Sequence, residues 1–231
     1  MSSLITIRNA ALVLLIAGTW HVGLAQPTPP KPKPQPNARW MMDYPEQDRP
    51  SASDSDVRRD PKYLPFLKAY LTQETFFDAG RRPLWQVAEE FLDVGSGRVK
   101  IYDSKYATIA GCVAHMCDTL QGFLWIDTAA KNPRVYFAAS TMIDDQGSGG
   151  DQKFFHLWIF ANQTLKDDDN GNLEPLPAEF LGPLAGWLGQ LNVASVMFVG
   201  HVGEMIPLLP ASLHPKNDSQ ATNKDVTKES Q

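Results

Sequence analysis

The residues with the clearest potential for chemistry form a short stretch that contains both cysteines of the chain. In order they are Cys112, Val113, Ala114, His115, Met116 and Cys117. If the two thiols oxidise, they close a ring that stabilises the fold by only about 2 kcal/mol, because the loop is very short. Such a ring is better suited to holding one side chain in place before a partner arrives, which lowers the entropic cost of binding. We therefore expect this cysteine ring to present His115.

The first residues of the chain indicate an oxidising compartment. Arg8 precedes an apolar run, 10–17, and small residues follow as far as Ala25. This order predicts a secretory signal peptide over residues 1–25, and the apolar run is too short for a membrane-spanning helix. Exported proteins normally join two cysteines to each other. We therefore expect a Cys112–Cys117 disulfide in a free periplasmic protein.

Composition divides the remaining chain into one region able to fold and two polar flanks. Residues 26–37 alternate proline with polar side chains, which predicts a semi-rigid polyproline spacer. Residues 39–60 are polar and charged, so we expect 26–60 as a whole to be a flexible linker. Residues 61–215 have the length and apolar content of one domain. The polar segment 216–231 predicts a disordered tail.

The net charge and the absence of certain motifs exclude several classes of function. The net charge of −5 at pH 7 argues against nucleic acid and anionic membrane surfaces as partners and suits a basic protein partner. The chain has no phosphate-binding glycine loop and no G-x-S-x-G or H-E-x-x-H motif. We therefore expect a protein that is not an enzyme and needs no cofactor or metal. The sequence leaves a homodimer open.

Apolar periodicity predicts helices early in the domain and strands after them. Helical spacing covers 63–77 and 84–94. The expected strands are 98–102, 106–109, 123–127, 135–139, 154–161 and 193–199, with a further helix over 177–191. This order indicates an α+β domain in which an antiparallel sheet carries helices on one face. The cysteine ring interrupts the run of strands and is expected to protrude as a loop.

Several neighbours of the ring extend its pattern. The C-x-x-H-x-C ring follows a strand that contains Tyr106, and it precedes a strand with Trp125 and a third strand, Val135-Tyr136-Phe137. The Leu84-Trp85 pair lies upstream. With these features, residues 84–140 resemble the Ivy family of periplasmic inhibitors of vertebrate lysozyme. The ring itself is more apolar than in the best-known members, which carry lysine and proline before the histidine and aspartate after it.

The resemblance implies a competitive protein inhibitor. In that family the disulfide ring protrudes from a sheet and its histidine enters the cleft of a c-type lysozyme; carried over, His115 is the key residue, and Cys112 and Cys117 set its geometry. A retaining glycosidase holds two carboxyl groups about 5 Å apart, and a protonated imidazole has two N–H groups to donate toward them. The implied partner is a c-type lysozyme, a related muramidase or a lytic transglycosylase, and the implied role is protection of peptidoglycan and evasion of host defence.

Other interpretations of the ring stay open. Cys112, His115, Met116 and Cys117 offer two thiolates, an imidazole and a thioether, a set that suits Cu(I) or zinc in a periplasmic metal-binding protein. The ring also fits a small structural disulfide with a solvated histidine, or an immunity or envelope-interaction protein directed against a peptidoglycan-cleaving enzyme.

Three further features are weaker candidates. Residues 167–172 resemble the start of a calcium loop, but Leu173 stands where such a loop needs glycine, so an acidic turn is the better interpretation. His156 lies in an apolar strand and is expected in the core or on a sheet face. His201 lies between glycines, at the end of a strand.

Overall fold

The computed structural model describes residues 36–45, 56–75, 80–95, 97–143, 153–164, 176–189 and 191–213. They belong to one compact unit of the chain, Gln35–Gln231. The predicted signal peptide, nearly all of the proline-rich spacer, the acidic turn at 167–172 and the polar tail lie outside the described residues. Within the described part, no helix has both the length and the apolar character needed to cross a lipid bilayer.

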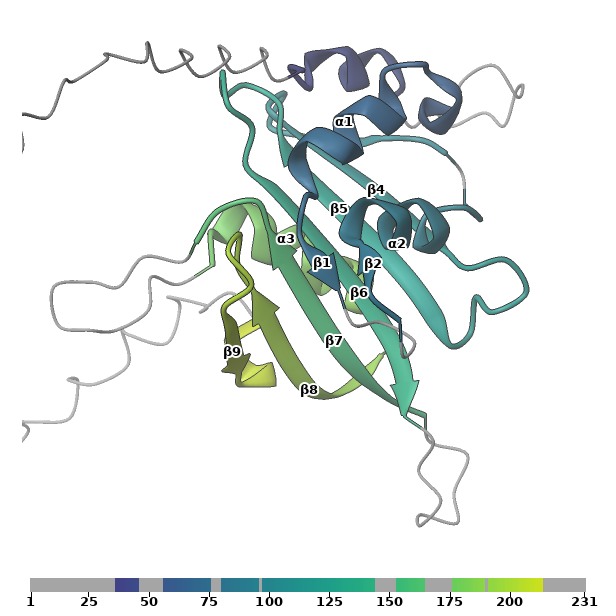
Figure 1. Cartoon of the computed structure of the whole chain (residues 1–231), viewed down its shortest axis with the longest axis vertical. Coiled ribbons are helices and arrows are strands. Elements are labelled where there is room, and N and C mark those ends of the chain that lie inside the picture. Colours follow the sequence, from purple (N-terminus) through teal and green to yellow (C-terminus); the bar gives the residue numbers. More distant parts are fainter. Residues whose placement is uncertain are drawn as a thin grey trace, which may run out of the picture. The chain divides into compact units, whose positions relative to one another are not determined.

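A seven-stranded sheet, with its strands in the order of the sequence, forms the centre of the fold (Figure 1). The strands are β3 (Lys100–Tyr102), β4 (Tyr106–Cys112), β5 (Leu120–Asp127), β6 (Val135–Ile143), β7 (Phe154–Ala161), β8 (Asn192–Val199) and β9 (Met205–Leu208). Neighbours are antiparallel except β7 and β8, which are parallel. Parallel neighbours need a crossover connection, and α3 (Ala178–Leu188) lies between them in the chain. The predicted α+β class is confirmed.

Helices lie against both faces of this sheet. Helices α1 (Tyr63–Tyr70) and α2 (Leu84–Phe91) pack with alternate residues of β5 and β6, such as Leu124 and Phe137, in one buried cluster. Residues of the opposite parity form a second cluster with α3. In Figure 1, α1 and α2 lie in front of the strands and α3 lies behind them. The predicted placement of helices on one face thus holds for α1 and α2, whereas α3 covers the other face.

Part of the predicted flexible linker is folded onto the domain. The short 3-10 helices η1 (Arg39–Asp43) and η3 (Val57–Arg59) contribute Trp40, Met41 and Val57 to the cluster around α1 and α2. The two segments are also joined, because the Tyr44 hydroxyl donates to Asp60 at 2.8 Å. The linker prediction is therefore wrong for residues 36–45 and 56–60. A few apolar side chains fold this stretch despite its polar composition.

Smaller elements complete the described chain. A two-stranded hairpin joins β1 (Glu74–Thr75) to β2 (Arg82–Pro83), immediately before α2. A last 3-10 helix, η5 (Pro210–Leu213), buries Leu213 in the cluster with α3. Between β3 and β4, the Lys105 amide donates to the Tyr102 carbonyl at 3.0 Å, and the two central residues of this turn, Asp103 and Ser104, both have positive φ, as a type I′ turn requires.

Candidate functional site

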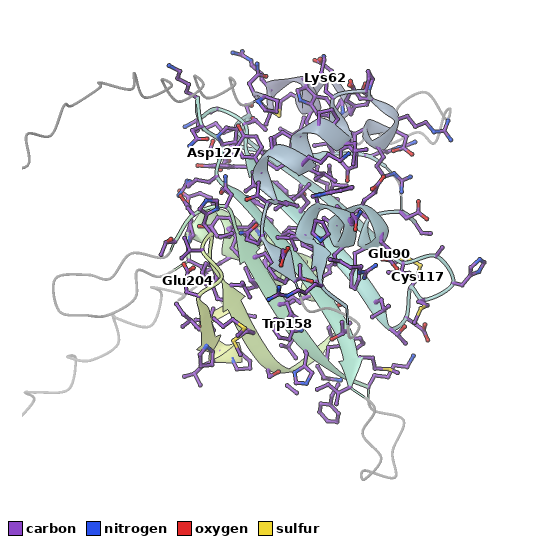
Figure 2. All side chains as sticks on the ribbon, in the orientation of Figure 1. Lys62, Glu90, Cys117, Asp127, Trp158 and Glu204 are labelled. Carbon is purple, nitrogen blue, oxygen red and sulfur yellow. A yellow bond between two sulfur atoms is a disulfide. The ribbon has the colours of Figure 1, made fainter. Side chains whose placement is uncertain are left out.

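The cysteine ring closes the far end of the β4–β5 hairpin. The two strands pair without a break from Tyr106–Asp127 to Cys112–Gln121, so β4 runs into the first cysteine. The sulfurs of Cys112 and Cys117 are bonded at 1.97 Å, and their Cα atoms lie 4.9 Å apart. The predicted disulfide is confirmed. Figure 2 shows Cys117 in a loop that projects beyond the ends of the strands.

His115 occupies the third position of a tight turn inside the ring. The amide of Met116 donates to the carbonyl oxygen of Val113 at 3.0 Å, which closes a four-residue turn. Within it only His115 has positive φ, at 64°, and this is the pattern of a type II turn. The position normally favours glycine, since a β-carbon is disfavoured at positive φ. The turn thus places an exposed imidazole at its corner.

One ring residue faces the core while three others face solvent. Val113 is only 8% exposed and belongs to the cluster around α1 and α2. Its amide donates to the Leu120 carbonyl at 3.1 Å, and the Leu120 amide donates to Met116 at 2.8 Å. His115, Met116 and Cys117 are exposed. The ring is therefore anchored at its base by an apolar side chain and by backbone hydrogen bonds.

A third backbone segment fixes the base of the ring from the side of α2. Val94 and Cys112 exchange amide hydrogen bonds of 3.0 and 2.8 Å in an isolated antiparallel bridge. Sequence patterns did not predict this bridge, because glycines at 95 and 97 indicated only that a helix ends. The segment that follows α2 therefore acts as an additional strand beside the first cysteine.

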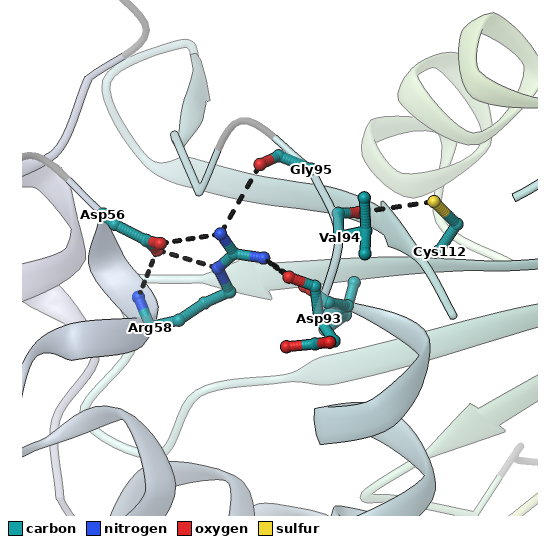
Figure 3. Close-up of polar contacts among 7 residues, drawn as sticks. Asp56, Arg58, Asp93, Val94, Gly95 and Cys112 are labelled. Atoms are coloured by element: carbon teal, nitrogen blue, oxygen red, sulfur yellow. Dashed lines mark hydrogen bonds and ion pairs between the residues drawn. The ribbon is translucent and has the colours of Figure 1, made fainter. Parts of the chain in front are cut away.

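Arg58 holds this segment in place (Figure 3). Its guanidinium donates to the carbonyl oxygen of Leu92 at 2.8 Å and also to those of Asp93 and Gly95. The carboxylate of Asp56 accepts from both Nε and Nη2 of Arg58, at 2.8 and 2.6 Å. These charge-assisted hydrogen bonds hold the pKa of Asp56 below its ordinary value. Arg58 thereby provides a donor for backbone carbonyl groups of the segment that follows α2.

Two glycines allow α2 to approach the hairpin closely. Gly111 and Gly122 face each other across β4 and β5. A β-carbon on Gly111 would lie 2.7 Å from the Cα of Leu92, and one on Gly122 would lie 2.7 Å from the carbonyl oxygen of Phe91. Any larger residue at either position would push away the end of α2 that supports the ring. The sequence offered one sign of this close approach, which is the glycine directly before Cys112.

Apolar and charged side chains surround the exposed part of the ring. Met116 is 44% exposed, Val94 39% and Met142 36%, and the Met142 amide donates to Thr119 at 2.9 Å, just beyond the ring. Lys153 lies 2.9 Å from the Asp118 carboxylate and lowers the pKa of that group through their hydrogen bond. Neither Val94 nor Met142 was expected beside the ring, because only backbone pairing with Cys112 and Thr119 brings them there.

The other histidine candidates lie elsewhere in the fold. His156 is exposed on β7, where its Nδ1 contacts the Ser195 hydroxyl on β8. His201 is exposed in the turn between β8 and β9. Across the described segments, no three His, Cys, Asp or Glu side chains are placed to hold a metal ion. Among the residues that the structure describes, the sequence-predicted site residues that the fold brings together are those of the ring.

Comparison of the chain with models of protein families, with curated proteins and with solved structures gave no match. Function is therefore inferred from the geometry of the ring and its supports.

Proposed function

We propose that this protein is an inhibitor that inserts the cysteine ring, led by His115, into the carboxylate-lined cleft of a c-type lysozyme or a related muramidase or lytic transglycosylase. One observation carries the proposal. The His115 side chain is exposed at the corner of a disulfide-closed turn whose base is fixed by Val113, by the bridge to Val94 and by the hairpin. On this proposal the protein is a binding protein and has no catalytic residues of its own.

The chemistry of the target supports an imidazole as the inserted group. A retaining glycosidase works with two carboxyl groups about 5 Å apart. A protonated imidazole carries two N–H groups that point away from each other, so it can donate to both carboxyl groups at once. Such charge-assisted hydrogen bonds are stronger than neutral ones. With the ring in the cleft, polysaccharide substrate is excluded by occupancy.

The rigidity of the ring supports tight binding. Ordering a flexible loop on association costs roughly 0.5–1.5 kcal/mol for each side chain that is immobilised, and preorganisation removes part of that cost. Here the disulfide, the turn hydrogen bond and the buried Val113 order the loop before any partner is present.

The surroundings of the ring fit a protein partner better than a small ligand. Exposed apolar side chains are common at the centre of protein interfaces, with charged groups toward the rim. Met116, Val94 and Met142 supply such apolar surface, and the Lys153–Asp118 ion pair lies beside it. The negative net charge of the chain favours a basic target.

The soft-metal alternative has less support. Metal-bound cysteine is a thiolate, whereas the sulfurs of Cys112 and Cys117 are bonded to each other. An immunity or envelope-interaction protein would use the same ring against a different peptidoglycan-cleaving enzyme. That alternative differs only in the target.

A cell-wall lysis assay against a panel of enzymes tests the proposal. The panel contains several c-type lysozymes, a bacterial muramidase and a lytic transglycosylase, each assayed with oxidised protein and with protein pretreated with reductant and alkylated. We expect oxidised protein to inhibit at least one member and reduced protein to inhibit it at least tenfold less. Absence of inhibition across the panel, or equal inhibition by both forms, contradicts the proposal.

A further inference from the structure

A separate groove lies on the opposite side of the hairpin from α2. It has a volume of about 300 Å³ and runs between α3 and the edge of the sheet formed by β3, β4 and β5. Its wall on the strand side carries Arg98, Lys100 and Tyr102, and its wall on the helix side carries Gly186 and Trp187. Phe123 also lines it, so two cationic side chains and three aromatic rings face one small concave surface. The proposed inhibitor function does not use it.

We propose that this groove binds a small anionic saccharide, a single pyranose ring that bears a carboxylate. Arg98 and Lys100 come from neighbouring positions on one side, so their positive charges reinforce each other there. Tyr102 and Trp187 supply flat apolar surface against which the C–H face of a sugar packs. Aromatic walls with a few polar groups are typical of small-molecule sites.

The volume of the groove fits a ligand of about the size of a single sugar ring. Small-molecule sites span roughly 300–1,000 Å³, and this groove lies at the lower limit of that range. A longer oligosaccharide would have most of its length outside it.

On the helix side of the groove, Trp187 is held in one orientation and Gly186 leaves space for a ligand. The indole of Trp187 stacks on Phe123 with ring centroids 5.3 Å apart and an interplanar angle of 22°, so its orientation is set before a ligand arrives. Beside it, a β-carbon on Gly186 would meet no atom within 4 Å. A helix interior normally disfavours glycine by about 1 kcal/mol relative to alanine. At Gly186 the missing side chain leaves the groove accessible.

Titration of the full chain with three probes tests this assignment. N-acetylmuramic acid carries both the sugar ring and a carboxylate, N-acetylglucosamine carries only the ring, and lactate carries only the carboxylate. Binding is followed by calorimetry and by tryptophan fluorescence. We expect N-acetylmuramic acid to bind at least tenfold more tightly than either of the other probes, and Lys100→Met to weaken its binding at least tenfold.

A matched pair of glycine variants places the ligand in the groove. Gly186→Leu puts a side chain into the groove, whereas Gly182→Leu adds the same side chain one turn earlier on α3, at a position that does not itself line the groove and where a β-carbon also meets no atom within 4 Å. We expect only Gly186→Leu to abolish binding, with both variants retaining the circular dichroism of the parent. Equal affinity for all three probes, tighter binding of lactate alone, or unchanged binding by Gly186→Leu would overturn the assignment. None of these results depends on inhibition of a lysozyme.

Discussion

The guanidinium of Arg58 connects two parts of the molecule that are distant in sequence. It forms an ion pair with Asp56 and donates hydrogen bonds to the carbonyl groups of Leu92 and Gly95. Arg58 is not itself part of the ring. Those residues flank Val94, which pairs with Cys112. The position of the ring thus depends on an ion pair located well outside it.

The Asp56–Arg58 pair is expected to make stability depend on pH. Arg58 holds the pKa of Asp56 below its ordinary value of about 3.9, so the folded state binds a proton there less readily than the unfolded state. The pair therefore stabilises the fold fully above about pH 4–5, and that contribution is lost as the pH falls through the lowered pKa. We expect Asp56→Asn to lower the free energy of unfolding by about 1–3 kcal/mol at pH 7, and by progressively less below pH 4.

Urea denaturation of parent and variant between pH 2.5 and pH 7 measures this difference. Asp43→Asn, which removes an exposed carboxylate from η1, outside the hydrogen bonds of Arg58, controls for the change in net charge. A gap between parent and Asp56→Asn that stays constant down to pH 2.5 would show that the pair does not act through its ionisation.

Single residues also mark the limit of what sequence patterns could predict at the site. The residue types and spacing of the ring were sufficient to predict the disulfide and the exposure of His115. The positive φ of His115 and the reach of Arg58 had no such signal. In a sequence, glycine is the usual sign of a left-handed backbone position, whereas here that position is occupied by histidine. Arg58 lies in a stretch whose polar composition indicated a flexible linker.

At the scale of elements, the support of the ring depends on the close contact between the end of α2 and the β4–β5 hairpin. We expect Gly111→Ala to lower the free energy of unfolding by about 1–3 kcal/mol, because its β-carbon would overlap the backbone of Leu92 and overpacking of this kind is destabilising. Gly182→Ala on α3 is the matched control, since its β-carbon meets no atom within 4 Å.

Urea midpoints of the two variants decide the matter. The control should be neutral or stabilising by up to about 1 kcal/mol, because alanine is the better helix former. If Gly111→Ala proved as stable as the parent, the close approach of α2 to the hairpin would not be a real constraint.

Apolar periodicity predicted strands best in the interior of the sheet and worst at its edge. Strand β7 has the predicted bounds, because its nearly continuous apolar run is buried in the interior of the sheet. Strand β9 was missed, since it is a short edge strand that contains Pro207, and proline is normally a signal against a strand. The first helix ends at Tyr70 rather than at 77, because the following residues turn into β1. The parallel pairing of β7 and β8 is a property of topology that no local pattern contains.

At the scale of the whole molecule, the sheet separates the two proposed binding sites. The side with α1 and α2 supports the base of the ring, while the side with α3 carries the groove. The sequence predicted the α+β class and one folded domain, because apolar content and the order of elements determine both. It placed the start of that domain too late, since Trp40, Met41 and Val57 belong to the core.

The most direct test of the proposed inhibitor measures the affinity of His115→Ala for the enzyme that the lysis panel identifies. His201→Ala changes another exposed histidine, in the turn between β8 and β9, and serves as the matched control. We expect His115→Ala to weaken binding by about 2 kcal/mol or more, the range of interface hot spots, which is about thirtyfold in the dissociation constant. Unchanged urea midpoints would show that both variants are folded. If His115→Ala bound as tightly as His201→Ala, the imidazole would not be the group that enters the cleft.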